Sequence, residues 1–230
     1  MKLVTARNVA LVILAALLTG LGVLIEDVTE GETLPFDQAF LLALREPGDP
    51  TNPIGPVWLE EVARDITALG GVAVLTLLTT LVTLHFFLRG KPRSGLFLAL
   101  AVISGTVLSN ILKGFFDRPR PELTAIMEYG KGSFPSGHST LSAVVYLTLA
   151  TMLALSSKRL ALKAFYLVSA VLLILLVGLS RLYLGVHYPT DVAAGWAIGA
   201  SWAILWSVVA SWLRDRDHIE SPGEHSATVR

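Results

Sequence analysis

The chain has 230 residues, of which 53% are hydrophobic and 16% charged, and its mean hydropathy is +0.64. Soluble domains carry about 25% charged residues, so this composition argues against a soluble domain and indicates an integral membrane protein. The formal net charge is +0, which argues against a nucleic-acid partner. The chain contains no cysteine, and this excludes disulfides, thiolate metal sites and a cysteine nucleophile.

Six apolar runs have lengths that suit a bilayer core of about 30 Å. We therefore expect an all-α bundle of six transmembrane helices that forms a single domain over residues 1–213. A cleaved signal peptide is the alternative for the first run, since Lys2 and Arg7 precede it. No clear small-residue cleavage site follows, which favours an uncleaved helix. The runs are Val9–Ile25, Ile66–Leu88, Ser94–Leu112, Ser139–Leu155, Leu160–Leu179 and Val192–Leu213.

Basic residues gather in short loops on one side of these six spans. Because basic loops stay in the cytoplasm, both termini are expected there, with a flexible tail over 214–230. The basic residues are Lys2 and Arg7, then Arg89, Lys91 and Arg93, then Lys158, Arg159 and Lys163, and finally Arg214 and Arg216.

An acidic segment, 26–65, connects the first and second spans on the outer side, with ten carboxylates and two arginines. Apolar residues repeat there at helical spacing, on both sides of a turn-rich loop at Glu46–Pro53. We expect two short amphipathic segments at the membrane interface, which either pack over the bundle or form a lid or lipid gate. The repeating residues are Phe36, Phe40, Leu41 and Leu44, and Trp58, Val62, Ile66 and Leu69.

Small residues within the spans suit close packing of transmembrane helices. They are Gly70 and Gly71 in the second run, Ser104 and Gly105 in the third, and Gly195 and Gly199 in the sixth.

Two polar clusters follow at the outer ends of spans. Lys113-Gly-Phe-Phe-Asp-Arg-Pro-Arg-Pro121 ends the third span. The cluster is either a basic anchor at the membrane interface or an anion site. The positive-inside rule disfavours cations on the outer side, which favours the anion site. Ser136 can cap the fourth span, and Gly137 lets the backbone approach a ligand. Free N–H groups at that helix start make an anion site, toward which His138 would project.

A third cluster, Ser180–Asp191, lies between the last two spans. Arg181 offers a permanently charged fork that suits phosphate oxygens. His187 can be neutral, and so nucleophilic, near neutral pH. Asp191 follows four residues later and can hold the imidazole by its other nitrogen if the chain turns there.

Together the three clusters resemble the signature of the type 2 phosphatidic acid phosphatase superfamily. Every position of Lys-x6-Arg-Pro, Pro-Ser-Gly-His and Ser-Arg-x5-His-x3-Asp is present in order over Lys113–Asp191. The positions are Lys113, Arg120 and Pro121, then Pro135, Ser136, Gly137 and His138, then Ser180, Arg181, His187 and Asp191.

The resemblance implies that His187 attacks phosphorus to form a phosphohistidine, while Asp191 fixes its tautomer. His138 would protonate the leaving oxygen and then activate water. The resemblance also implies that phosphate is bound without a metal or any other cofactor, and it leaves Asp117 and Arg118 without a role. The phosphate-binding set is Lys113, Arg120, Ser136, Gly137 and Arg181.

The expected function is that of a membrane lipid phosphatase acting at the periplasmic face of a bacterial inner membrane. Phosphatidic acid, phosphatidylglycerol phosphate, undecaprenyl diphosphate and lipid A phosphates are all candidate substrates, and the oligomeric state is open. A phosphotransferase that passes the phosphoryl group to a lipid or sugar hydroxyl is the close alternative. A transporter or lipid-binding protein is the remote one, since polar residues inside spans often mark transport paths.

Overall fold

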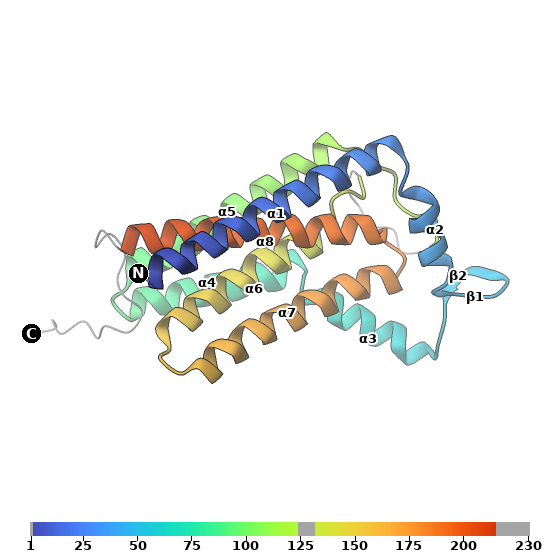
Figure 1. The fold of residues 1–230 in the computed structure, drawn as a ribbon. Helices are drawn as coiled ribbons and strands as arrows, with labels where there is room; N and C mark the ends of the chain where they lie inside the picture. Colours follow the sequence, from blue (N-terminus) through green and yellow to red (C-terminus); the bar gives the residue numbers. More distant parts are fainter. Residues whose placement is uncertain (1, 124–131, 215–230) are drawn as a thin grey trace, which may run out of the picture.

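The computed structural model describes residues 2–123 and 132–214. Long helices form a bundle, and the short elements α2, β1 and β2 gather at one end of it (Figure 1). Apart from Arg214, the expected tail over 214–230 lies outside the described residues. The elements are α1 (Lys2–Glu30), α2 (Leu34–Leu42), β1 (Arg45–Glu46), β2 (Asp49–Pro53), α3 (Val57–Ala68), α4 (Val72–Leu88), α5 (Pro92–Phe115), α6 (Gly137–Ser156), α7 (Leu160–Tyr183) and α8 (Pro189–Arg214).

Five helices within the described residues are long and apolar enough to cross a membrane: α1, α5, α6, α7 and α8. A sixth crossing is formed if α3 and α4, which meet at a bend of 42°, count as one span. The membrane bundle predicted from hydropathy is therefore confirmed, with one change in its second span.

The second predicted span, Ile66–Leu88, is a broken span and not a continuous helix. α3 ends at Ala68 and α4 begins at Val72, because Gly71 is extended, with φ −73 and ψ 148. Carbonyl groups at a helix end need new partners, and the hydroxyl of Tyr146 donates a hydrogen bond of 2.7 Å to the carbonyl of Leu69. The break therefore has its own stabilising contact from α6.

The other helices extend beyond the predicted apolar runs. α5 continues to Phe115, α7 continues to Tyr183, and α8 begins at Pro189. Lys113, Arg181 and Asp191 consequently lie in the last turn of α5, the last turn of α7 and the first turn of α8, whereas Arg120 and His187 lie in segments between helices. Helical backbone fixes the directions of the first three side chains more tightly than a loop would.

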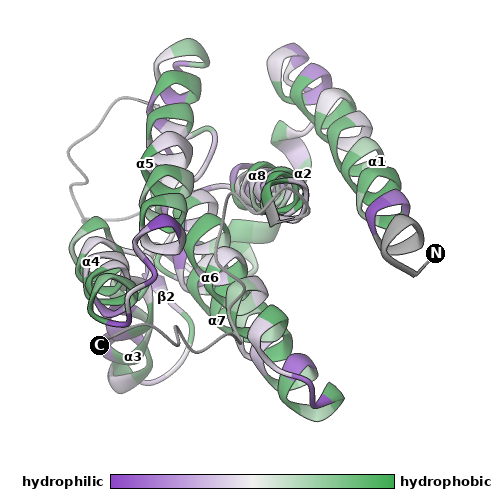
Figure 2. Ribbon diagram, turned by 90° about the vertical axis from the view of Figure 1, so that its left-hand side faces the viewer, coloured by the Kyte–Doolittle hydropathy of each residue, from purple (hydrophilic) through white to green (hydrophobic). Residues whose placement is uncertain are grey.

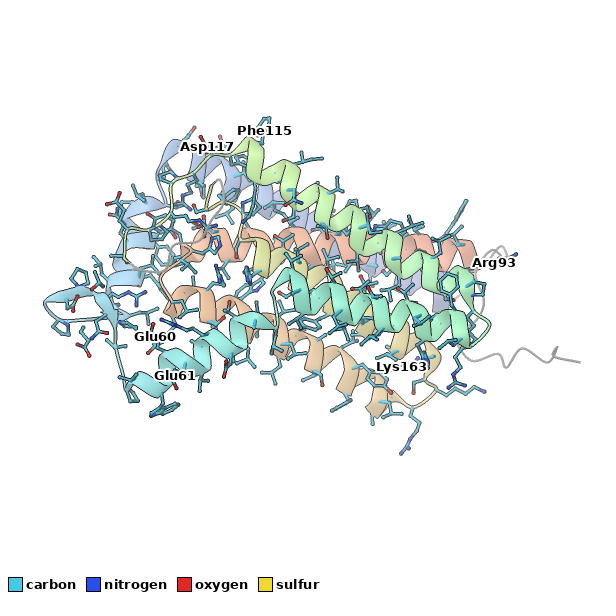
Figure 3. All side chains as sticks on the ribbon, turned by 180° about the vertical axis from the view of Figure 1, so that it is seen from behind. Glu60, Glu61, Arg93, Phe115, Asp117 and Lys163 are labelled. Carbon is cyan, nitrogen blue, oxygen red and sulfur yellow. The ribbon has the colours of Figure 1, made fainter. Side chains whose placement is uncertain are left out.

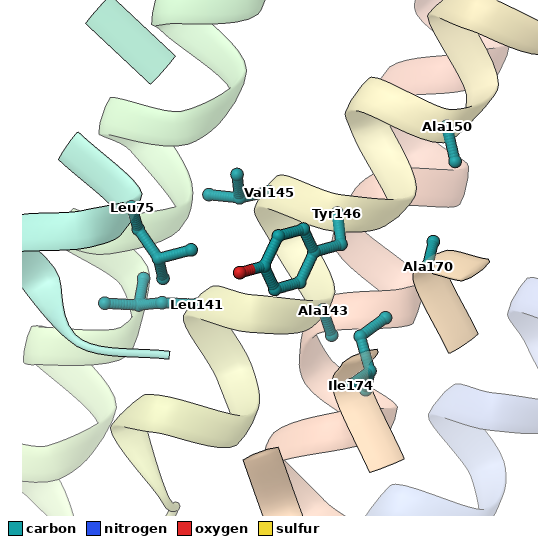
Figure 4. Close-up of a cluster of buried hydrophobic side chains, with 8 residues drawn as sticks. All are labelled: Leu75, Leu141, Ala143, Val145, Tyr146, Ala150, Ala170 and Ile174. Atoms are coloured by element: carbon teal, nitrogen blue, oxygen red, sulfur yellow. The ribbon is translucent and has the colours of Figure 1, made fainter. Parts of the chain in front are cut away.

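α6 is the central helix, and it packs against α8, α7, α5 and α4. A cluster of buried apolar side chains joins α4, α6 and α7 (Figure 4). α8 lies especially close to α6, since a Cβ on Gly195 would be 2.8 Å from the carbonyl oxygen of Ser136. A Cβ on Gly105 would likewise lie 2.9 Å from Cγ1 of Val144. The packing role predicted for these glycines is confirmed.

Most residues of the long helices are hydrophobic, as Figure 2 shows. α1 packs mainly along α8, and none of its most apolar 18-residue window is buried. Many large apolar side chains are exposed along α1, α4, α5 and α7. Such a surface suits contact with lipid tails and not with water.

The outer segment contains the two predicted helices, α2 and α3, but its turn-rich part forms a small hairpin. β1 pairs antiparallel with β2, with Arg45 opposite Pro53 and Glu46 opposite Asp49. Gly48 turns the chain with φ +91, a conformation that glycine adopts without steric cost.

The two ends of the bundle differ in charge. Arg93 and Lys163 lie at one end, whereas Glu60, Glu61 and Asp117 lie toward the other (Figure 3). The start of α1, the α4–α5 turn, the α6–α7 turn and the end of α8 share the basic end (Figure 1).

Candidate active site

The start of α8 organises the site, which lies at the end of the bundle opposite the basic end (Figure 1 and Figure 3). Asp191 lies in the first turn of α8, where a carboxylate is favoured by the helix dipole. Its Oδ2 accepts a hydrogen bond of 2.9 Å from the backbone N–H of Tyr188, as the third residue of a helix often does for the residue at its cap. Asp191 is fully buried, and the hydrogen bond from Tyr188 orients its carboxylate.

His187 lies directly beside this carboxylate. Its Nδ1 is 3.4 Å from Oδ2 of Asp191, a separation longer than a well-formed N–H···O hydrogen bond. The ring is fully buried, and Nε2 has no hydrogen-bond partner among the described residues. The structure therefore brings together the predicted His187–Asp191 pair, with the second ring nitrogen unengaged by the described chain.

The pKa of His187 is lowered to about 4, chiefly by burial. The contact with Asp191 opposes this shift, whereas the charges of Arg181 and Arg120 add to it. The imidazole is consequently neutral at neutral pH, as a nitrogen nucleophile must be.

Two predicted cations come close to the turn that carries His187. Arg181, in the last turn of α7, is 3% exposed, and its Nη1 donates a hydrogen bond of 3.2 Å to Oγ1 of Thr67. Nη1 of Arg120 donates a hydrogen bond of 3.1 Å to the carbonyl of Val186. Both arginines act electrostatically on His187.

The start of α6 adds the Pro-Ser-Gly-His cluster to the same site. The N–H of Ser136 donates a hydrogen bond of 3.0 Å to the carbonyl of Asp191, which joins the starts of α6 and α8. The hydroxyl of Ser136 caps α6 by accepting from the N–H of Ser139. A Cβ on Gly137 would lie 3.2 Å from Nζ of Lys113, so the lysine ammonium lies against the first turn of α6.

His138 follows in that first turn and is half-buried. Gly70, in the break between α3 and α4, lies against it, since a Cβ there would be 3.3 Å from the carbonyl oxygen of His138. Thr67 contacts Arg181 and Gly70 lies against His138, so the broken span lies beside two predicted site residues. The sequence analysis assigns neither Thr67 nor Gly70 to the site. The only sequence signal is the glycine pair at 70–71, which equally indicates close helix packing.

Arg118 and Asp37 are further residues that the sequence prediction did not place in the site. Nη1 of Arg118 donates a hydrogen bond of 2.7 Å to Oδ1 of Asp191, and its Nη2 donates one of 2.7 Å to Oδ2 of Asp37. Burial alone would lower the pKa of Arg118, but Asp191 and Asp37 together raise it. Arg118 therefore remains charged and bridges two carboxylates.

Arg45 of β1 also reaches the turn between α7 and α8 that carries His187. Its side chain is buried against Gly185, which has φ +70. Burial lowers the pKa of Arg45, and Glu60 is among the groups that oppose the shift.

Within residues 2–123 and 132–214, no group of three or more histidine or carboxylate side chains is arranged to hold a metal ion. The expectation of metal-free chemistry nevertheless stays a prediction, because only a chelator experiment can test it.

Comparison with known proteins points to one superfamily. The model of the PAP2 superfamily matches residues 94–215, a range that contains all the predicted site residues. Phosphatidylglycerophosphatase B of Bacillus subtilis is 36% identical over 147 residues, which cover 62% of this chain and 70% of that protein. A lipid A 1-phosphatase of Rhizobium johnstonii is 32% identical over 127 residues, or 50% of this chain and 47% of the relative.

A solved structure shows the same architecture. The crystal structure of a transmembrane PAP2-type phosphatidylglycerolphosphate phosphatase from Bacillus subtilis superimposes with a TM-score of 0.74 at 29% sequence identity. The match covers 87% of this chain and 96% of that one.

The fold and the arginine-rich histidine site define a membrane-spanning phosphatase, a phosphoric ester hydrolase. The chain belongs to the PAP2 superfamily.

Proposed function

We propose that the chain removes the phosphate group of a membrane lipid through a phosphohistidine formed on His187, without a metal ion. One observation carries the proposal. The buried imidazole of His187 lies 3.4 Å from Asp191 and within the electrostatic reach of Arg181 and Arg120. Phosphoryl transfer depends mainly on positioning and on charge stabilisation, and fixed arginines supply that charge.

In the first step, Nε2 of His187 attacks phosphorus and the bond from phosphorus to the lipid oxygen breaks. His138 donates a proton to that oxygen, and the lipid alcohol leaves. In the second step, water attacks the phosphohistidine, His138 takes a proton from the water, and the P–N bond breaks to release inorganic phosphate. Asp191 holds the Nδ1 side of His187 throughout.

Lys113, Arg120 and Arg181 would surround the transferring group, with the backbone at Ser136 and Gly137 as further donors. The contact of the lysine ammonium with Gly137 supports this assignment. So does the start of α6 itself, since the N–H groups of a helix start bind anions.

Phosphatidylglycerol phosphate is the first substrate to test, because the Bacillus subtilis relatives matched in sequence and in structure carry that activity in their names. The basic turns at the opposite end of the bundle support a location in the bacterial inner membrane, with both termini cytoplasmic and the site on the periplasmic face.

The test is phosphate release by purified protein in detergent with EDTA present. Phosphatidylglycerol phosphate, phosphatidic acid, undecaprenyl diphosphate and lipid A are compared as substrates. We expect release that persists in EDTA and disappears in His187→Ala. His85→Ala is the matched control, because His85 is exposed near the basic end of α4.

Because no acceptor alcohol is added, phosphate release also separates a hydrolase from a phosphotransferase. Wild-type protein that folds but releases no phosphate from any lipid would contradict the proposal. Release that stops in EDTA would contradict its metal-free chemistry.

A further inference from the structure

Asp37, in the outer helix α2, has an unusual environment for a residue of an acidic surface segment. Among the described residues, Asp37 and Asp191 are the two buried carboxylates, and both are 0% exposed. A buried carboxylate is costly unless hydrogen bonds and an opposite charge compensate it. The hydrogen bonds and the opposite charge that compensate Asp37 therefore indicate its role.

The partners of Asp37 all lead to the start of α8. Its Oδ1 accepts a hydrogen bond of 3.1 Å from the N–H of Thr190, and its Oδ2 accepts one of 2.6 Å from the hydroxyl of Thr190. Oδ2 also accepts a hydrogen bond of 2.7 Å from Nη2 of Arg118. Asp37 therefore contacts the residue next to Asp191 in sequence and the cation that binds Asp191.

Four residues contact the guanidinium of Arg118. Its two terminal nitrogens bind Asp37 and Asp191, each at 2.7 Å. Nη1 also donates to Oγ1 of Thr190 at 2.9 Å, and the guanidinium lies 4.4 Å from the centre of the Tyr188 ring. An arginine fork bound to two carboxylates has little rotational freedom, so it fixes both of them.

The charges of Asp37, Asp191 and Arg118 do not cancel. Two carboxylates share one guanidinium, which leaves one net negative charge. If Asp37 were absent, the guanidinium would neutralise Asp191, and His187 would face a neutral pair. With Asp37 present, Asp191 retains negative character toward Nδ1 of His187.

We infer that Asp37 and Arg118 are positioning residues that orient Asp191 and balance the charge it presents to His187. The inference rests on the proposed function, because it assigns these residues to the reaction of His187. It also gives the outer segment a role in that reaction. Leu41 of the same helix is buried against Leu182 and Val192, so α2 is fixed over the site by packing as well as by charge.

Opposite changes of charge distinguish this role from a purely structural one. Asp37→Asn removes a negative charge and should make protonation of His187 harder, which moves the acid limb of kcat/KM to lower pH. Arg118→Gln removes a positive charge and should move that limb toward neutral pH. Each displacement is expected to be on the order of half to one pH unit. The charged groups that act on His187 are Asp191, Arg181 and Arg120. Glu122 acts on Tyr188, whose ring lies against Arg118.

The experiment measures kcat/KM from pH 2.5 to 8 for the wild type, for both variants and for the double variant. The double variant restores the net charge, so its acid limb should return toward that of the wild type even if its rate stays low. Matched controls are Asp49→Asn and Arg64→Gln, which remove the same charges from exposed positions of the outer segment. Neither control should move the limb.

Loss of rate in both single variants with an unmoved acid limb and parallel losses of thermal stability would overturn the inference, since that is the result of a structural clamp alone. Wild-type rate and profile in both would also overturn it. A wild-type enzyme that hydrolyses lipid phosphate while His187→Ala does not would leave the proposed function intact in either case.

Discussion

Nη1 of Arg181, in the last turn of α7, donates a hydrogen bond of 3.2 Å to the hydroxyl of Thr67, near the end of α3. The two residues are 114 positions apart in the sequence. Their contact exists because the second span breaks after Ala68, which brings the end of α3 against α7. The break thus contributes to the site as well as to the fold.

Thr67→Val is expected to reduce kcat/KM by about tenfold, because a hydrogen bond to a charged group contributes about 1.5–3 kcal/mol and tenfold corresponds to about 1.4 kcal/mol. Steady-state kinetics on the best lipid substrate checks it. Thr106→Val is the matched control, since the Thr106 hydroxyl donates to the carbonyl of Val102 in its own helix. Equal kinetics for the two variants would show that Thr67 does not support Arg181.

Gly70→Ala should lower kcat by displacing His138. The added Cβ would meet Cγ1 of Val177 and lie 3.3 Å from the carbonyl oxygen of His138. Overpacking of this kind costs about 1–3 kcal/mol, so the thermal midpoint should also fall. Gly20→Ala provides the comparison, because a Cβ there has no neighbouring atom within 4 Å. A Gly70→Ala enzyme with wild-type kcat would argue against this contact.

Hydropathy was sufficient to predict the membrane bundle, with five spanning helices and a sixth crossing if α3 and α4 count as one span, and motif spacing was sufficient to predict that the chain belongs to the PAP2 superfamily. Hydropathy could not locate the break in the second span, because Ile66–Leu88 is apolar on both sides of Gly70 and Gly71. The glycine pair was the only local signal, and glycine in a membrane helix equally suits close packing.

Asp37 could not be distinguished from the other carboxylates of the acidic segment for a related reason. Ten acidic residues lie between 26 and 65, and nothing in the spacing shows which of them is buried. Its role depends on Arg118, 81 positions away. Burial and pairing of this kind arise from tertiary contacts, which a periodic pattern does not encode.

Gly185→Ala should destabilise the turn that carries His187. Gly185 has φ +70, and Nη2 of Arg45 occupies the place of the new Cβ. The left-handed conformation alone costs about 1–2 kcal/mol for a residue with a side chain. Gly48→Ala isolates that cost, because Gly48 has φ +91 and open space around it. Thermal unfolding should show a larger loss for Gly185→Ala, partly recovered by Arg45→Ala in the same chain. Equal losses for the two glycine variants would contradict the contact with Arg45.

The pH dependence should be asymmetric about neutrality. Burial lowers the pKa of His187 to about 4, so this group stays neutral and reactive as the pH falls from 7 and is lost only near that value. His138 must be protonated to assist the leaving group, so the rate should fall once His138 loses its proton at higher pH. A profile of kcat/KM from pH 4 to 9 should therefore show activity retained at pH 5 and a decline on the alkaline side. An acid limb near 6.5 would show that His187 is not held neutral by burial.

Trapping of the covalent intermediate tests the role of His187 most directly. The enzyme is mixed with a lipid labelled with ³²P in its terminal phosphate, in EDTA, and the reaction is quenched rapidly with alkali, since phosphohistidine is stable to alkali and labile to acid. We expect the label on the peptide that contains His187, with none in His187→Ala. Continued turnover with no label on that peptide would contradict a histidine nucleophile.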